Sequence, residues 1–214
     1  MRPVFFITGI GTGVGKTLVS AILTEALDAD YWKPIQAGYA DGTDALQVSQ
    51  WLSTPDKKIQ QELYKLKLPA SPHIAAREEG ISISLENIKT AFDRLCLASN
   101  RPLIIEGAGG LMVPLNESQT LLDLIKILDA PVIVVSRNYL GSINHSLLTA
   151  NALKQAGAKL AGWVFNDQFM QYEAEISQWT EIPILGSIPF TDTPDKDFVR
   201  QQAGLIAPGL KKLV

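Results

Sequence analysis

Four short runs of the chain are apolar at nearly every position, without the alternation of a half-exposed strand. They are "VFFIT" at 4–8, "PLIIEG" at 102–107, "PVIVVS" at 131–136 and "LAGWVFN" at 160–166. Runs of this kind are typical of strands buried on both faces, as in a parallel sheet. Two weaker strand candidates are "DYWKPI" at 30–35 and "IPILGSIP" at 182–189.

Segments with the spacing of amphipathic helices lie between these runs. They cover residues 15–28, 43–52, 86–99, 118–129, 142–156 and 171–180. Ser118 and Ser142 stand where N-caps are expected for the fourth and fifth of these helices. Strands that alternate with helices along nearly the whole chain predict an α/β fold. We expect a doubly wound, mainly parallel sheet with helices on both faces.

The segment 53–85 has no clear periodicity. It contains "LPASPHIAAREEG", with two prolines, and a run of polar residues. A long irregular insertion in a compact domain is often functional. The chain has 214 residues, of which 46% are apolar, and this suits one domain over residues 1–214.

Charge and cysteine content argue against several classes of protein. The formal net charge is -3, whereas nucleic acids and membrane surfaces are bound through a basic footprint, so we expect neither partner. The single cysteine, Cys96, cannot form a disulfide framework. The opening "MRPVFFITGIGTG" has an apolar run too short for a signal peptide or a membrane span. These features predict a soluble, cytoplasmic protein.

The stretch "ITGIGTGVGKTLVSAIL" at 7–23 includes Gly15, Lys16 and Thr17, the core of a phosphate-binding loop. The common form G-x-x-x-x-G-K-[ST] would begin with glycine at position 10, which is Ile10, so the loop is one residue longer when counted from Gly9. Its context is the one the motif needs: an apolar strand, glycines whose N–H groups can face a polyanion, and a helix N-terminus. We predict that Lys16 contacts the β- and γ-phosphates of a nucleotide and that Thr17 contacts Mg²⁺.

Three more charged residues stand at unusual places. Glu106 ends the strand in "LIIEGAGG", and ligands of doubly wound sheets bind beyond the carboxyl ends of the strands. A carboxylate there is costly unless it meets a cation. Asp44 is near the start of a helical segment, where it suits either the helix dipole or a metal ion. Lys33, followed by Pro34, ends the second strand, and taken alone it would be a solvated lysine.

The motifs "SPHIAA" at 71–76 and "GSINHSLLTA" at 141–150 also stand out. A Gly-Ser pair at a helix start, as in the second motif, can hold an anion through backbone N–H groups. Each motif contains one of the two histidines, His73 and His145. We interpret both as hydrogen-bonding or packing residues rather than as general bases.

Taken in order along the chain, these stretches resemble the dethiobiotin synthetase family. The matching segments are "TGIGTGVGKT", "WKPIQAG", "TDALQ", "LPASPHIAAREEG", "EGAGGLMVPL", "LGSINHSLLTANAL", "AGWVFND" and "LGSIPF". Together they extend from residue 8 to residue 190. The most specific parts are Lys-Pro after the second strand, Ser-Pro-His-Ile, Glu-Gly-Ala-Gly-Gly and Gly-x-Ile-Asn-His.

This resemblance implies an ATP-using C–N ligase of the P-loop NTPase superfamily that works as a homodimer. Its substrates would be 7,8-diaminononanoate, CO₂ (or bicarbonate) and ATP, with Mg²⁺ as the cofactor. One amine takes up CO₂ as a carbamate, and the carbamate attacks the γ-phosphate to give a carbamic–phosphoric anhydride. The second amine then displaces phosphate, and the cyclic urea of dethiobiotin closes. The product belongs to biotin biosynthesis.

The resemblance also implies roles for individual residues. The catalytic residues would be Lys33, Lys16 and Thr12. The residues expected to contact the nucleotide are Gly13, Val14, Gly15, Lys16, Thr17, Leu18, Asp44, Glu106, Gly107, Ala108, Gly109, Asn166, Asp167, Pro189 and Phe190. The residues expected to contact the substrate are Thr12, Lys33, Ala37, Gly141, Ser142 and Asn144. The residues expected to bind Mg²⁺ are Thr17, Asp44 and Glu106.

More finely, the resemblance places Lys33 on the carbamate and Thr12 near the reacting groups. Asn166 would bind the adenine, with Pro189 and Phe190 beside it. The helix start at 141–144 would hold the substrate carboxylate across the dimer interface.

Two positions depart from the family pattern. Gly13 stands where a familiar form of the loop, T-D-T-E-V-G-K-T, has a glutamate. Ala37 stands where a serine or threonine commonly contacts the substrate. Both changes affect fine positioning, and neither removes a metal or phosphate ligand, so we expect activity to survive them.

Three other interpretations remain at this stage. An ATP-driven switch of the septum-site or plasmid-partition type shares the superfamily, but a related branch has a second loop lysine where this chain has Gly11. The tail "LIAPGLKKLV", with its Pro-Gly break, would also make a poor membrane helix. The synthetase half of a cobyrinate amidase usually carries a glutaminase domain, for which this chain has no room. A degenerate paralogue that binds nucleotide without turnover is motivated only by Gly13 and Ala37.

Overall fold

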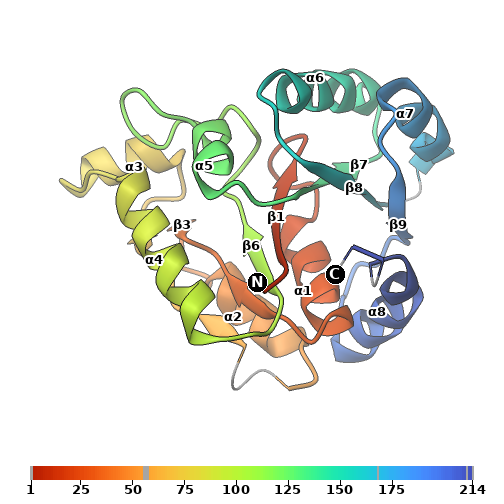
Figure 1. The fold of residues 1–214 in the computed structure, drawn as a ribbon, viewed down its shortest axis with the longest axis horizontal. Coiled ribbons are helices and arrows are strands. Elements are labelled where there is room, and N and C mark those ends of the chain that lie inside the picture. Colours follow the sequence, from red (N-terminus) through yellow and green to blue (C-terminus); the bar gives the residue numbers. More distant parts are fainter. Residues whose placement is uncertain (1, 55–57, 168, 211, 214) are drawn as a thin grey trace.

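A seven-stranded sheet forms the middle layer of the molecule (Figure 1). The computed structural model describes residues 2–54, 58–167, 169–210 and 212–213. The strand order is β4-β2-β6-β1-β7-β8-β9, and all neighbouring pairs are parallel. These strands are β1 (Val4–Gly9), β2 (Asp30–Trp32), β4 (Ile59–Gln60), β6 (Leu103–Glu106), β7 (Val132–Arg137), β8 (Leu160–Asn166) and β9 (Ile184–Ile188).

Helices cover both faces of this sheet. One face packs against α4 (Leu85–Ala98), α5 (Leu121–Leu128), α6 (Ser142–Gln155) and α7 (Glu173–Thr180). The other face packs against α1 (Lys16–Ala26), α2 (Asp44–Trp51) and α8 (Lys196–Leu210). Successive strand residues point to opposite faces, so Phe6 joins the first core while Phe5 and Ile7 join the second. The prediction of a doubly wound, mainly parallel α/β fold is confirmed.

The structure corrects two predicted helix starts. Helix α5 has Thr120 as its N-cap rather than Ser118, because the side chain of Asn116 accepts the N–H groups of Ser118 and Gln119 in a turn that precedes the helix. Helix α6 has Gly141 as its N-cap. That residue has φ 105°, which glycine adopts readily, and Ser142 becomes the first helical residue.

Segment 53–85 contains more regular structure than its sequence pattern predicts. It includes β4, a further strand β5 (Tyr64–Leu66) and helix α3 (Pro72–Glu78). Strand β5 pairs with β3 (Ile35–Ala37) in a second, two-stranded parallel sheet. The predicted strand 30–35 is therefore split between two sheets. Pro34 lies at the break, since it has no N–H with which to continue a ladder.

Helix α8 is not among the predicted helices, and it continues through Pro208 to Leu210. A proline inside a helix loses one backbone hydrogen bond and is normally disruptive. Here Val199, Ala203, Ile206 and Leu210 are all buried at helical spacing, and this packing keeps the helix on the sheet. A short 3₁₀ helix, η1 (Phe169–Gln171), precedes α7. Among the helices described, none is both long and apolar enough to span a bilayer.

Candidate active site

The phosphate-binding loop connects β1 to α1 at the carboxyl edge of the sheet. Gly13 and Gly15 have φ 73° and 90°, in the left-handed region that favours glycine. A Cβ atom on Gly15 would lie 2.0 Å from Nδ2 of Asn166, so no side chain fits there. The Nζ of Lys16 donates to the carbonyl oxygen of Gly11 at 2.9 Å, inside the loop. The unusual glycine spacing therefore still gives a closed loop that leads into a helix N-terminus.

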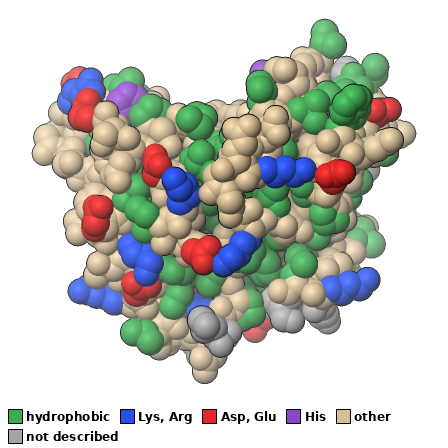
Figure 2. Space-filling model, turned by 45° about the horizontal axis from the view of Figure 1, so that its top comes forward, with side chains coloured by type: hydrophobic (Ala, Val, Ile, Leu, Met, Phe, Trp, Pro, Cys, Tyr) green, Lys and Arg blue, Asp and Glu red, His purple; other side chains and the backbone are tan. Residues whose placement is uncertain are grey.

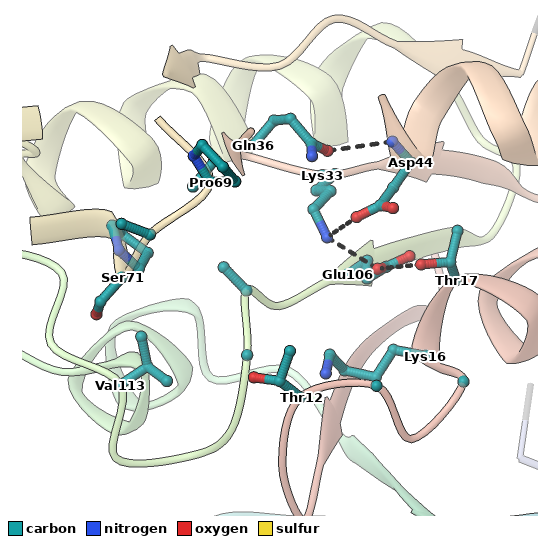
Figure 3. Close-up of a pocket in the computed structure, with 17 residues that line it drawn as sticks. Thr12, Lys16, Thr17, Lys33, Gln36, Asp44, Pro69, Ser71, Glu106 and Val113 are labelled. Carbon is teal, nitrogen blue, oxygen red and sulfur yellow. Dashed lines mark hydrogen bonds and ion pairs between the residues drawn. The ribbon is translucent and has the colours of Figure 1, made fainter. Parts of the chain in front are cut away.

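Lys33 lies between two carboxylates from different elements (Figure 3). Its Nζ is 2.9 Å from Oε1 of Glu106 and 2.5 Å from Oδ2 of Asp44. Strand pairing accounts for the first contact: Trp32 lies beside Ile105 in the β2–β6 ladder, and one further residue brings Lys33 to Glu106. The second contact comes from the first residue of α2.

Electrostatics keep Lys33 charged in this cluster. Burial alone would lower its pKa, but the negative charges of Glu106 and Asp44 outweigh burial and raise the pKa. Glu106 is only 1% exposed. A buried carboxylate is costly without a cation, and Lys33 is the cation that compensates it.

Lys16 differs from Lys33, because burial dominates and lowers the pKa of Lys16 to about 8, although the charge of Glu106 opposes this shift. A bound phosphate would give the Lys16 ammonium an anionic partner in addition to the carbonyl of Gly11.

Two hydroxyl groups complete the contacts of Glu106. Thr17 donates to Oε1 at 3.0 Å, and Tyr31 donates to Oε2 at 2.9 Å. Burial and the neighbouring charge of Glu106 raise the pKa of Tyr31 well above its ordinary value, so the phenol keeps its proton and acts as a donor. The sequence analysis missed Tyr31. Its signal is a tyrosine two residues before Lys33, but only the strand order shows that it lies next to Glu106.

Gln36 is a second residue that sequence reasoning missed. Its side-chain oxygen accepts the backbone N–H of Asp44 at 3.1 Å, and its amide nitrogen donates to the carbonyl of Gly38 at 2.8 Å. Gln36 is only 6% exposed, and both ends of its amide are satisfied. It therefore anchors the start of α2 and so fixes the backbone of Asp44.

A cavity of about 740 Å³ opens over this cluster. The predicted site residues that line it are Thr12, Gly13, Gly15, Lys16, Thr17, Lys33, Ala37, Asp44, Glu106, Ala108 and Gly109. The opposite wall is largely apolar and consists of Pro69, Ala70, Pro72 and Val113, with Ser71 between them (Figure 3). Most of this wall belongs to segment 53–85, so this segment contributes directly to the cavity.

A second cavity, of about 690 Å³, lies on the other side of the phosphate loop. Five predicted residues line it, namely Thr12, Gly13, Val14, Asp167 and Phe190. Asn166 closes this region against the loop, since its Nδ2 donates to the carbonyl of Val14 at 3.1 Å. Asp167 pairs with Arg137 at 3.3 Å. The residues expected around the adenine thus lie at the ends of β8 and β9.

Several predicted residues line neither cavity: Leu18, Gly107, Asn166, Pro189, Gly141, Ser142 and Asn144. Ser142 is buried, and its Oγ accepts the N–H of Tyr139 at 3.3 Å. A Cβ on Gly107 would lie 2.9 Å from the Leu121 side chain, so packing explains this glycine.

The two histidines make hydrogen bonds to nearby hydroxyl groups, in line with the interpretation from the sequence. Nδ1 of His73 is 3.0 Å from the hydroxyl of Ser71, and Nδ1 of His145 is 2.6 Å from that of Tyr139.

The side chains around Lys33 match the way nucleotide enzymes hold Mg²⁺. That ion is usually bound by one or two carboxylates together with phosphate oxygens and water, rather than by a cage of protein ligands. Asp44 and Glu106 both pair with Lys33, and the Thr17 hydroxyl donates to Glu106, so one hydroxyl and two carboxylates lie in one connected cluster. In the part of the chain that the structure describes, no group of three or more His, Cys, Asp or Glu residues forms a separate metal site.

Comparison with known proteins identifies the family. A family model described as an AAA domain matches residues 4–196. The ATP-dependent dethiobiotin synthetase of Christiangramia forsetii is 45% identical over 204 residues, which cover 95% of each chain. The one from Cytophaga hutchinsonii is 52% identical over 162 residues, or 76% of each chain. The chain belongs to the dethiobiotin synthetase family. The resemblance found in its motifs is confirmed.

Solved structures share the overall fold of this dethiobiotin synthetase family member. The MinD cell division protein of Aquifex aeolicus aligns with a TM-score of 0.62 at 14% identity, covering 99% of this chain and 96% of that one. The cell division ATPase MinD of Pyrococcus furiosus aligns with a TM-score of 0.58 at 16% identity, covering both chains fully. At such low identity these matches show the fold alone.

Proposed function

We propose that this protein closes the ureido ring of dethiobiotin from 7,8-diaminononanoate and CO₂ at the expense of ATP, a step of biotin biosynthesis. The family supports this reaction, and one observation in the structure carries it. Lys33, Asp44 and Glu106 meet beside a phosphate-binding loop and face a cavity. We propose further that residues 1–214 act as one catalytic domain in the cytoplasm.

In this proposal ATP binds along the phosphate loop. The loop N–H groups, the N-terminus of α1 and Lys16 hold the phosphates. The base lies towards Asn166, Asp167, Pro189 and Phe190, close to the second cavity. Thr17, Asp44 and Glu106 would hold Mg²⁺, which neutralises charge on the β- and γ-phosphates.

The lining of the first cavity is charged in one part and apolar in another, which suits a reacting carbamate and the carbon chain that carries it. Lys33 and Lys16 supply positive charge where an anionic carbamate would approach the anionic γ-phosphate, and Thr12 lies on the same rim. Stabilising charge that builds up in a transition state is usually a large part of catalysis. Apolar side chains such as Pro69, Pro72 and Val113 suit the carbon chain of a diaminononanoate. Ala37 also lines this cavity, and its methyl group adds no polar contact.

We also propose that the active unit is a homodimer. Gly141, Ser142 and Asn144 line neither cavity of their own chain, which supports a role in the site of a partner. Leu140 is 90% exposed and Leu148 is 60% exposed, beside and within α6. Figure 2 shows hydrophobic side chains gathered on the raised part at the upper right of the molecule. Analytical ultracentrifugation of the wild type and Leu148→Glu tests this, and a monomeric wild type would contradict it.

The reaction itself is tested by phosphate release from ATP. With Mg²⁺ and bicarbonate, release should depend on 7,8-diaminononanoate, and dethiobiotin should appear in equal amount. Such a result would also show that Gly13 and Ala37 are tolerated. Slow hydrolysis that is indifferent to the diamine would contradict the proposal and favour an ATP-driven switch or a degenerate paralogue.

A further inference from the structure

Glu106 is hydrogen-bonded differently at its two oxygens. Oε1 accepts from Thr17 and Lys33, both of which line the first cavity. Oε2 accepts from Tyr31, which is fully buried and is not among the lining residues. Oε1 is thus hydrogen-bonded to side chains that line the cavity, whereas Oε2 is hydrogen-bonded to a side chain in the protein core.

The strand ladder explains how Tyr31 reaches Glu106. Tyr31 lies beside Ile104 in the β2–β6 pairing, and Glu106 is two residues further along β6, on the same face. This diagonal distance suits an aromatic side chain. Tyr31 belongs to the core between the sheet and helices α1, α2 and α8, so packing fixes its ring.

Packing alone does not account for the hydroxyl group of Tyr31. A phenylalanine would fill the same volume, whereas a buried hydroxyl must be compensated by a hydrogen bond. The hydroxyl has such a partner in Oε2 of Glu106, and the bond is 2.9 Å long. Carboxylates that bind metal ions are commonly oriented by a hydrogen bond from a second layer of residues.

We propose that Tyr31 is a positioning residue for the metal site. By holding Oε2, its hydroxyl turns Oε1 of Glu106 towards the cavity, where this oxygen can bind Mg²⁺. This inference rests on the proposed role of Glu106 as a metal ligand. In this role Tyr31 supports the metal site without touching either the nucleotide or the substrate.

The test measures metal affinity directly. Mn²⁺ binding to the enzyme–ADP complex is followed by electron paramagnetic resonance for the wild type and Tyr31→Phe. Losing a hydrogen bond to a metal ligand typically costs about 10–100-fold in metal affinity, and Tyr31→Phe should fall in this range. Tyr64→Phe is the matched control, because the Tyr64 hydroxyl accepts the N–H of Ser84 away from the cluster. The control should bind Mn²⁺ like the wild type.

Glu106→Gln separates this inference from the proposed function. Wild-type Mn²⁺ affinity in Glu106→Gln would remove Glu106 from the metal site and overturn both. Weak binding in Glu106→Gln together with wild-type binding in Tyr31→Phe would overturn the role of Tyr31 alone. If Tyr31 acts through Glu106, adding Tyr31→Phe to Glu106→Gln should cause no further loss. The Mg²⁺ concentration for half-maximal turnover of Tyr31→Phe should also rise by a larger factor than its rate at saturating Mg²⁺ falls.

Discussion

The two ends of strand β2 carry buried charges with opposite surroundings. Asp30 begins the strand, and Lys33 follows its last residue. At the first end, Arg2 donates to Asp30 at 2.6 Å and to the carbonyl oxygens of Arg101 and Leu95 at 2.6 and 2.5 Å. At the second end, Lys33 faces a cavity and contacts Asp44, whose side chain is 35% exposed.

This difference distinguishes an ion pair that stabilises the fold from an ion pair that belongs to the proposed active site. The donors of Arg2 are directed to partners inside the protein, so that end of the sheet can change little without losing stability. The carboxylates around Lys33 lie beside open space, where a metal ion or a phosphate could exchange with existing partners. Burial of a charge therefore does not by itself mark a functional site, whereas burial beside a cavity does.

The largest effect on stability is expected from Arg2→Ala. Without Arg2 the buried Asp30 keeps only the more distant Arg101, 3.8 Å away. Breaking a buried pair costs up to about 3–5 kcal/mol of unfolding free energy. Urea unfolding measures this loss. The exposed pair Arg200–Asp197 provides the control, since Arg200→Ala should cost at most about 1 kcal/mol. Equal stability of the two variants would contradict a structural role for the Arg2 cluster.

Lys33→Met should affect turnover more than any other lysine change outside the phosphate loop. Losing one preorganised electrostatic group typically slows a reaction about 10²–10³-fold. Lys58→Met is the matched control, because Lys58 is also buried and pairs with Asp28 at 2.6 Å, before β2 begins. Phosphate release at saturating substrates should be close to wild type in the control. Similar rates for both variants would remove Lys33 from the chemistry.

Gln36→Ala should have an intermediate effect. It removes the acceptor that holds the N–H of Asp44, and a typical hydrogen bond contributes about 0.5–1.5 kcal/mol. We expect the Mg²⁺ concentration for half-maximal turnover to rise about 2–10-fold, by converting that energy into an equilibrium constant. Gln47→Ala is the control, because Gln47 belongs to α2, the helix that Asp44 begins, and its side chain makes an exposed hydrogen bond to Gln50. An unchanged Mg²⁺ dependence in Gln36→Ala would show that Asp44 does not need this anchor.

The smallest effect is expected at Asp123, a half-buried carboxylate in the first turn of α5. It accepts hydrogen bonds from the backbone and hydroxyl of Thr120 at the start of α5, and the backbone bond lowers its pKa. Asp123→Ala should cost about 1 kcal/mol at neutral pH. Because the folded-state pKa is lowered, this contribution is present above the ordinary carboxyl pKa and is lost as the pH falls through the folded-state value. Unfolding curves of the two proteins should converge in acid, and a constant difference would contradict this role.

The sequence predicts the strands that are buried on both faces and the helices between them. It misses α8, because Pro208 suggests a break and only packing against the sheet shows that the helix continues. It also misses β5 and α3, which are short and have weak patterns. Short elements depend on contacts with distant segments, and these are not visible in local periodicity.

The residue types along the chain were enough to indicate a phosphate loop, a carboxylate that needs a cation and a family of ligases. Tertiary structure decided which of these groups meet. Lys33 and Glu106 are 73 residues apart in the sequence, and the pairing of β2 with β6 places them side by side. The same pairing gives Tyr31 its place behind Glu106, since side chains two residues apart share one face of a strand. Composition and motif carry chemical identity, whereas strand order sets the distances on which the chemistry depends.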